Sequence, residues 1–152
     1  MQRRAFLIQL GHRLLTAAAV LATPKTSLAA WPAAHFAAGE FRQRFAEVFG
    51  DAVVSDSIDI QLALPDVAEN GAVVPLTISS TLEGIEKLYI WVEKNPTPLA
   101  AQFDWNDAVE LFLTARIKMA ESCSVIVIAK QGERLLRAQR WVKVMQGGCG
   151  TG

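Results

Sequence analysis

Residues 58–64 have the sequence Ile-Asp-Ile-Gln-Leu-Ala-Leu, in which large apolar side chains alternate with polar or small ones. Successive side chains of a β-strand point to opposite faces of a sheet, so this alternation predicts a strand with one buried face. The segment Glu69-Asn70-Gly71-Ala72 follows, and Asn-Gly is the strongest short-range signal of a hairpin turn. We therefore expect Val73 to Ser79 to form the second arm, with Pro75 marking an edge or the start of that strand.

Five more apolar or alternating runs follow along the chain, separated by turn residues. They are residues 85–92, 99–105, 109–117, 122–129 and 135–145. About seven short strands without intervening helices predict an all-β fold, an immunoglobulin-like β-sandwich. The cysteine–tryptophan–cysteine pattern of antibody domains is absent from the sequence, so the prediction rests on the strands and turns. We expect Trp91, Trp105 and Trp141 to fill or rim the core of this sandwich.

One helix is predicted before the strands, over His35 to Phe49. Its apolar side chains recur at helical spacing, with charged residues between them, and Gly50 follows as a stop signal. We expect this amphipathic helix to pack on the body of the domain through its apolar face.

Residues 1–30 are predicted to be a cleaved export signal. Two arginines precede a Phe-Leu pair in Arg3-Arg4-Ala5-Phe6-Leu7, which is the pattern of a twin-arginine signal. The apolar stretch 14–22 is too short for a bilayer span of about 20 residues, and small residues allow cleavage after Ala29 or Ala30. The alternative is an amphipathic helix of the folded domain. The prediction is therefore a periplasmic protein with a domain over 31–146 and a C-terminal arm over 147–152.

The composition of the mature chain excludes several classes of function. Four of the fifteen basic residues and none of the fifteen acidic ones lie in residues 1–30, which leaves eleven against fifteen and a net charge of −4. No basic stripe remains for a phosphate backbone, so nucleic-acid binding is not expected. His35 is the only histidine left, which excludes most metal sites and histidine-dependent triads in the body of the domain.

Two cysteines lie in contrasting surroundings. Cys123 belongs to a strand-like run, where cysteine usually acts as a small hydrophobic side chain on a sheet. Cys149 lies among glycines near the end of the sequence, and no core explains its presence. An intramolecular disulfide between the two is the alternative, since an exported protein permits one.

We expect the thiol of Cys149 to react in the active sites of other proteins. It has no neighbouring base or helix in the sequence, so its pKa should stay near the free value of about 8.5. Only a few per cent of it is then thiolate at neutral pH, which is weak for an enzyme acting alone. Three or four residues beyond the last strand extend about 10–14 Å, and glycines keep this arm thin. The sequence predicts a carrier that bears a covalent cargo on Cys149, with Gly147, Gly148 and Gly150 as a flexible arm.

Three alternatives to a carrier stay open at this point. The C-terminal residues could be an incidental frayed terminus. The chain could be an exported β-sandwich that only binds or scaffolds a partner and does not use its tail. It could also be a thiol enzyme, which would need a depressed pKa at Cys149 and a base that the sequence does not supply.

The chain resembles SoxY, the sulfur-carrier subunit of the bacterial thiosulfate-oxidising Sox system. The resemblance covers essentially the whole chain, from the twin-arginine leader to the C-terminus. It includes Ala68-Glu69-Asn70-Gly71 with Val74-Pro75, Glu93-Lys94-Asn95-Pro96-Thr97-Pro98, Thr114-Ala115-Arg116-Ile117 and Gln146-Gly147-Gly148-Cys149-Gly150. The terminal Gly-Gly-Cys-Gly is the specific part, whereas the turn motifs are shared with many β-proteins.

This resemblance implies a function, partners and a site. It implies an immunoglobulin-like sandwich that pairs with a SoxZ-like subunit as a heterodimer and carries sulfur intermediates on Cys149. A haem-containing SoxAX-like enzyme would load thiosulfate, a manganese-dependent SoxB-like hydrolase would release sulfate, and SoxCD-like partners would process the remaining sulfur. The carrier itself would need no cofactor. The chain departs from the usual Gly-Gly-Cys-Gly-Gly ending at Thr151, and Cys123 is unexpected in its strand.

Overall fold

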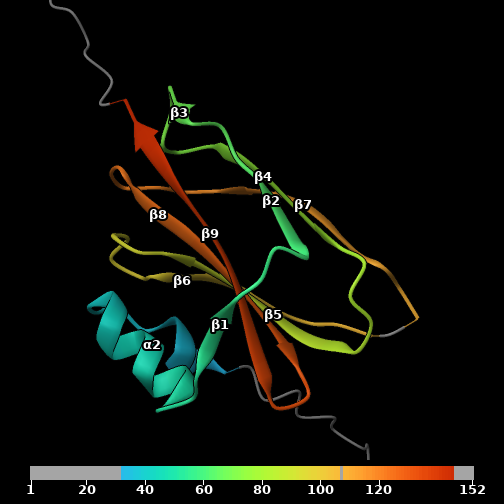
Figure 1. The fold of residues 1–152 in the computed structure, drawn as a ribbon. Coiled ribbons are helices and arrows are strands. Elements are labelled where there is room, and N and C mark those ends of the chain that lie inside the picture. Colours follow the sequence, from blue (N-terminus) through green and yellow to red (C-terminus); the bar gives the residue numbers. More distant parts are fainter. Residues whose placement is uncertain (1–31, 107, 146–152) are drawn as a thin grey trace, which may run out of the picture. The chain divides into compact units, whose positions relative to one another are not determined.

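Nine β-strands in two facing sheets make up most of the described chain (Figure 1). The computed structural model describes residues 32–106 and 108–145. The strands are β1 (Val54–Asp56), β2 (Ile60–Ala63), β3 (Val67–Ala68), β4 (Val74–Ser80), β5 (Ile85–Val92), β6 (Leu99–Asp104), β7 (Leu111–Ile117), β8 (Cys123–Gln131) and β9 (Arg134–Val144). The chain divides into two units at residues 31 and 32, and every described residue belongs to the second.

The two sheets have the arrangement expected of a sandwich. The larger sheet has the order β1-β9-β8-β5-β6, and β3 also pairs with β9. The smaller sheet has the order β2-β4-β7. Neighbouring strands are antiparallel, except that β1 and β3 both run parallel to β9. All seven predicted strands are present, so the predicted all-β, immunoglobulin-like sandwich is confirmed, and β1 and β3 are additional.

The main core lies between the sheets, where alternating side chains of both meet. The smaller sheet contributes Leu76 and Ile78 from β4, and the larger sheet contributes Leu88 from β5 and Val127 from β8, all nearly inaccessible to solvent. Burying apolar side chains of this size stabilises the fold by about 1.5–3 kcal/mol each. The predicted alternation therefore arises because one face of each strand contributes to this core.

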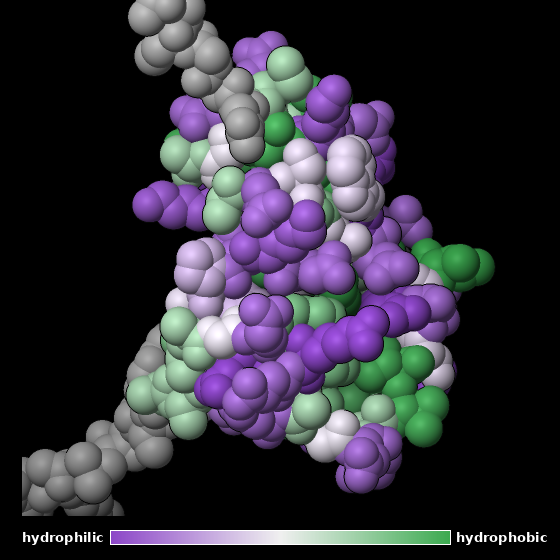
Figure 2. Space-filling model, turned by 90° about the vertical axis from the view of Figure 1, so that its left-hand side faces the viewer, coloured by the Kyte–Doolittle hydropathy of each residue, from purple (hydrophilic) through white to green (hydrophobic). Residues whose placement is uncertain are grey.

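A second apolar cluster lies on the outer face of the larger sheet, under a short helix. The 3-10 helix η1 (Ala33–Phe36) and the α-helix α2 (Phe41–Phe49) cover this face. Phe45 of α2 packs against the fully buried Trp91, with ring centroids 5.4 Å apart. Figure 2 views the side on which α2 lies, where hydrophilic residues predominate at the surface. The predicted amphipathic helix does pack on the domain as expected.

The predicted helix over residues 35–49 is wrong in its first half. The structure has η1, a break, and then α2 beginning at Phe41. Gly39 in the break has φ +150°, outside helical geometry, and its N–H donates to the carbonyl of Pro96 at 3.0 Å. That tertiary bond fixes the break, whereas the predicted end of the helix at Gly50 is correct, with φ +59°.

The predicted hairpin is correct in its antiparallel pairing of β2 with β4 but wrong in its tight connection at Asn70-Gly71. A turn does form there, because the N–H of Val73 donates to the carbonyl of Asn70 at 3.2 Å. However, β2 and β4 are joined by the long segment 64–73, which crosses to the other sheet and adds β3 to β9. Pro75 lies at the start of β4, before the residues that pair with β2, so the predicted strand start is confirmed.

The three tryptophans do not share one environment. Trp91 is fully buried, and Trp105 is partly buried against the main core, with its indole N–H donating to the carbonyl of Val109 at 2.9 Å. Trp141 is 57% exposed, so its predicted place in or around the core is wrong. Its neighbour Val142 is fully buried, and alternation along β9 therefore turns Trp141 toward the opposite, outer face.

Candidate functional site

The predicted site residues lie outside the residues that the structure describes. Cys149 and the arm glycines Gly147, Gly148 and Gly150 all fall in residues 146–152. The predicted leader and its predicted cleavage region fall in residues 1–31, which are likewise outside. The described chain ends at Met145, directly after β9. The described residues nearest to the predicted site form the end of the sandwich that leads into the C-terminal segment.

The end of β9 is held on both sides by hydrogen bonds. On one side, β3 runs alongside it, and the N–H of Met145 donates to the carbonyl of Ala68 at 2.9 Å. On the other, the hydroxyl of Ser122 accepts from the N–H of Val144 at 2.9 Å and donates to its carbonyl at 3.4 Å. These bonds fix the backbone up to the last described residue, since each contributes roughly 0.5–1.5 kcal/mol.

Gly71 permits a close approach of three segments at this end. Its carbonyl accepts from the N–H of Met119 at 2.7 Å. A Cβ at position 71 would lie 2.4 Å from the Met119 carbonyl oxygen and 2.8 Å from Cγ1 of Val144. The turn predicted from Asn-Gly therefore serves to pack three segments together at the end of β9.

Asn95 joins two of the loops around this end. Its side-chain amide donates to the carbonyl of Lys118 at 2.8 Å and accepts from the N–H of Ala120 at 2.9 Å. A hollow of about 500 Å³ lies beside these loops, lined by Gly71, Ala72, Asn95, Pro96, Thr97, Lys118, Met119 and Ala120. The motifs containing Asn70-Gly71 and Asn95-Pro96, which are far apart in the sequence, thus meet at the end that leads into the C-terminal segment.

Charged side chains around this end are partly paired. Lys94 pairs with Glu121 at 3.2 Å, and Arg140 pairs with Asp66 at 2.7 Å. Both pairs are largely exposed, so each contributes about 0–1 kcal/mol. Lys143 of β9 has no ion pair within residues 32–106 and 108–145. Among the described residues of β9, it is therefore the cation nearest to the C-terminal segment that has no carboxylate partner.

Cys123 has the structural role predicted for it. Its side chain is 2% exposed and belongs to the main core. Burial raises the pKa of its thiol, an effect only partly offset by a hydrogen bond from the backbone N–H of Lys94. A buried thiol of raised pKa is a poor nucleophile, so Cys123 does not offer a reactive site.

Other described residues do not assemble a catalytic or metal site. His35 forms a hydrogen bond with Gln102 at 3.1 Å, far along the chain from either cysteine. No group of three or more potential ligand side chains within 32–106 and 108–145 is placed to hold a metal ion. None of the helices in the described part of the chain is long and apolar enough to cross a membrane.

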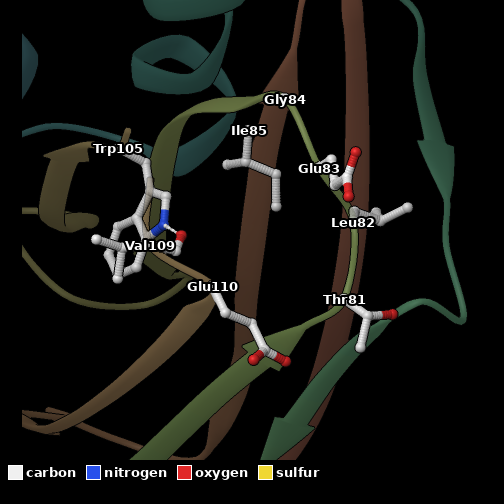
Figure 3. Close-up of a pocket in the computed structure, with 8 residues that line it drawn as sticks. All are labelled: Thr81, Leu82, Glu83, Gly84, Ile85, Trp105, Val109 and Glu110. Atoms are coloured by element: carbon white, nitrogen blue, oxygen red, sulfur yellow. Dashed lines mark hydrogen bonds between the residues drawn. The ribbon is translucent and has the colours of Figure 1, made fainter. Parts of the chain in front are cut away.

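A second hollow, of about 280 Å³, lies at the opposite end of the sandwich, where β4 ends and β7 begins. Figure 3 shows Trp105 and Val109 on one side of it, Leu82 and Glu83 on the other, and Ile85 between them. This hollow contains no histidine or cysteine. Its position beside the start of β7 also separates it from the end of β9.

Comparison with protein families identifies the chain. The family model of the sulfur oxidation protein SoxY matches residues 45–149, so that its match ends at Cys149. The chain belongs to the SoxY family. The match includes α2 in part, all nine strands and the end of β9.

A solved structure of a SoxY protein agrees with the SoxY assignment. The sulfur carrier protein SoxY from Chlorobium limicola f thiosulfatophilum is 32% identical, with a TM-score of 0.63, and the match covers 70% of this chain and 97% of that one. A superoxide reductase (neelaredoxin) from Ignicoccus hospitalis is 16% identical, with a TM-score of 0.47, over 57% of this chain and 80% of that one. Comparison with curated proteins gave no match.

The sequence predicts only some of the residues that hold the end of β9 in this SoxY-family chain. The turn motifs at Asn70-Gly71 and Asn95-Pro96 signalled turns, but not that the turns would meet at the end of β9. Ser122 was not singled out at all. A serine immediately before a strand is a weak signal, because its partner Val144 is 22 residues away in the sequence.

Proposed function

We propose that this chain is a periplasmic covalent sulfur carrier of thiosulfate oxidation, which holds its intermediates on the thiol of Cys149. The family match carries this proposal, because it runs through the sandwich and ends at that cysteine. The Chlorobium relative is a sulfur carrier protein by description. The chain is not itself the catalyst in this proposal; partner enzymes act on the group it carries.

In the proposed reaction sequence, a sulfur–sulfur bond at Cys149 attaches the cargo to the chain. A haem-containing SoxAX-like partner would take two electrons as the thiolate of Cys149 and thiosulfate join through a new sulfur–sulfur bond. A SoxB-like hydrolase would then release sulfate with water, and SoxCD-like partners would oxidise the remaining sulfur. A SoxZ-like subunit would accompany the carrier as a heterodimer, and the twin-arginine leader over 1–30 would export it.

The geometry at the end of β9 supports a carrier. The backbone is held by hydrogen bonds up to the N–H of Met145, and Cys149 is the fourth residue beyond it. Four residues extend at most about 13–14 Å. In the proposed carrier, Gly147 and Gly148 before the thiol and Gly150 after it would give a thin, flexible arm, so that the thiol could enter an active site that the sandwich cannot.

Mass spectrometry of the intact mature protein tests the proposal. Incubation with thiosulfate and the oxidative partner should add one thiosulfonate group to the wild type and none to Cys149→Ser. The matched control Cys123→Ser should still be loaded, because that buried thiol takes no part. Loading that persists in Cys149→Ser would remove the assignment to Cys149.

Deletion of Gly147 to Gly152 distinguishes a carrier from a domain that only binds a partner. A carrier should lose thiosulfate oxidation completely while its sandwich keeps the thermal stability of the wild type. Retained pathway activity after the deletion would show that the tail is not used.

A further inference from the structure

An apolar patch lies on the outer face of the larger sheet, at the end of β9. Trp141 is 57% exposed, and Met145 and Val67 are each 47% exposed. Trp141, Lys143 and Met145 lie at every second position along the chain, so their side chains point to the same face of the sheet. Val67 of β3 is the parallel partner of Lys143, which brings it to the same face. These four residues, Val67, Trp141, Lys143 and Met145, form what we call the β9 patch.

Neighbouring residues leave the indole of Trp141 uncovered. Its cross-strand partner on β8 is Ser124, a small side chain. On the other side of β9, strand β3 spans only two residues. It pairs with Lys143 and Val144 and so does not reach Trp141. Grouped exposed apolar side chains mark interaction surfaces in soluble proteins, and tryptophan is enriched among the residues that dominate binding energy.

The position of the patch restricts what can cover it. Met145 is itself a member of the patch, and Cys149 follows four residues later, within about 13–14 Å. An enzyme that takes this thiol into an active site must bring its own surface within that distance of Met145. Recessing the active site to exclude water shortens the distance further, because part of the tether is then inside the enzyme.

We propose that the β9 patch is the docking surface for the catalytic partners that act on Cys149, an inference that rests on the proposed carrier function. The partner surface is the rim of the channel that admits the C-terminal segment. Its chemistry is apolar, to cover Trp141 and Met145, with a carboxylate or other acceptor opposite Lys143. A constitutive partner subunit would bind elsewhere, since covering this patch would block the enzymes.

Steady-state kinetics with the carrier as substrate test this surface. The full mature chain, with its partner subunit, is compared with Trp141→Ala and with Phe112→Ala, whose side chain is 67% exposed on β7 of the other sheet. Trp141→Ala should lower kcat/KM about tenfold or more for both the thiosulfate-loading and the sulfate-releasing enzymes. The loss should lie in KM, with kcat retained at saturation, and Phe112→Ala should behave as the wild type.

Further measurements separate docking from other effects. The reaction of Cys149 with a small disulfide reagent should be unchanged in Trp141→Ala, because the tether and thiol are intact. Met145→Ser is a second variant of the patch and should show the same rise in KM. Unchanged kcat/KM in both variants would overturn the proposal, as would loss of the partner subunit from Trp141→Ala. Failure of the wild type to be loaded at Cys149 would instead overturn the carrier function itself.

Discussion

Gly71→Ala should destabilise the sandwich at the base of the C-terminal segment. The added Cβ would lie 2.4 Å from the Met119 carbonyl oxygen and 2.8 Å from Cγ1 of Val144, whereas ordinary contacts begin at 3.4 Å. Relief of the backbone contact requires a shift of about 1 Å, since overlapping atoms repel steeply. That shift would break the hydrogen bond from the Met119 N–H to the Gly71 carbonyl, now 2.7 Å long.

The magnitude follows from these two effects. Overpacking of this kind costs about 1–3 kcal/mol, and the lost hydrogen bond adds about 1 kcal/mol. Gly71→Ala should therefore lower the free energy of unfolding by about 2–4 kcal/mol. For a domain of this size the corresponding fall in Tm is roughly 8–16 °C. Urea unfolding followed by circular dichroism measures the first quantity, and calorimetry measures the second.

A control substitution and a double variant test whether the contacts of the added Cβ cause the destabilisation. Gly132→Ala adds the same methyl group where no atom lies within 4 Å, at φ +56°, so it should cost only the backbone strain of about 1–2 kcal/mol. Val144→Ala in the Gly71→Ala background removes one contact but leaves the one with Met119, so stability should not be restored. A Gly71→Ala variant within about 0.5 kcal/mol of the wild type would refute the reasoning.

Three further outcomes are expected. Ser122→Ala should cost about 1 kcal/mol and speed hydrogen exchange at the Val144 amide, because the hydroxyl holds that N–H; unchanged exchange would contradict this clamp. Native protein should react with a disulfide reagent at Cys149 only, and Cys123 should react after unfolding. Since burial raises the pKa of the Cys123 thiol, its contribution to stability should be fully present below the unfolded-state pKa of about 8.5 and should be lost as the pH rises through the higher folded-state pKa; Cys123→Ala should therefore lose less stability than the wild type over that pH range. Phe45→Ala should cost about 2–3 kcal/mol, less than a fully buried phenylalanine, and alter the near-ultraviolet circular dichroism of the buried indole it contacts; an unchanged spectrum would argue against that packing.

The long strands could be predicted from the sequence because each carries its own pattern of alternation. β4, β5, β7 and β8 all lie within one or two residues of their predicted runs. β1 and β3 could not be predicted, since two or three residues hold no period. They form because β9 offers them a backbone to pair with, and that partner lies about 75–80 residues away in the sequence.

Individual side chains show the same limit. Ile58 fits the alternation that predicted the first strand, yet it is 88% exposed and precedes β2. The high average burial of tryptophan favours a place for Trp141 in or around the core. The buried Val142 beside it instead determines which face Trp141 occupies. The conflict was visible in the sequence as two adjacent large apolar residues in one strand. Only the structure shows which of the two the core takes.

The hydrogen bonds at the end of β9 set the length of the proposed tether. If residues 143–145 were released, the tether to Cys149 would grow from four residues to seven, and its reach from about 14 Å to about 25 Å. Its effective concentration at a docked active site would fall roughly twofold, because that concentration declines as about the −3/2 power of tether length. Release would also remove Lys143 and Met145 from the β9 patch, so the clamp by Ser122 and Ala68 serves reach and docking together. A carrier with a loosened clamp should therefore lose kcat/KM with its partner enzymes by more than the tether length alone accounts for.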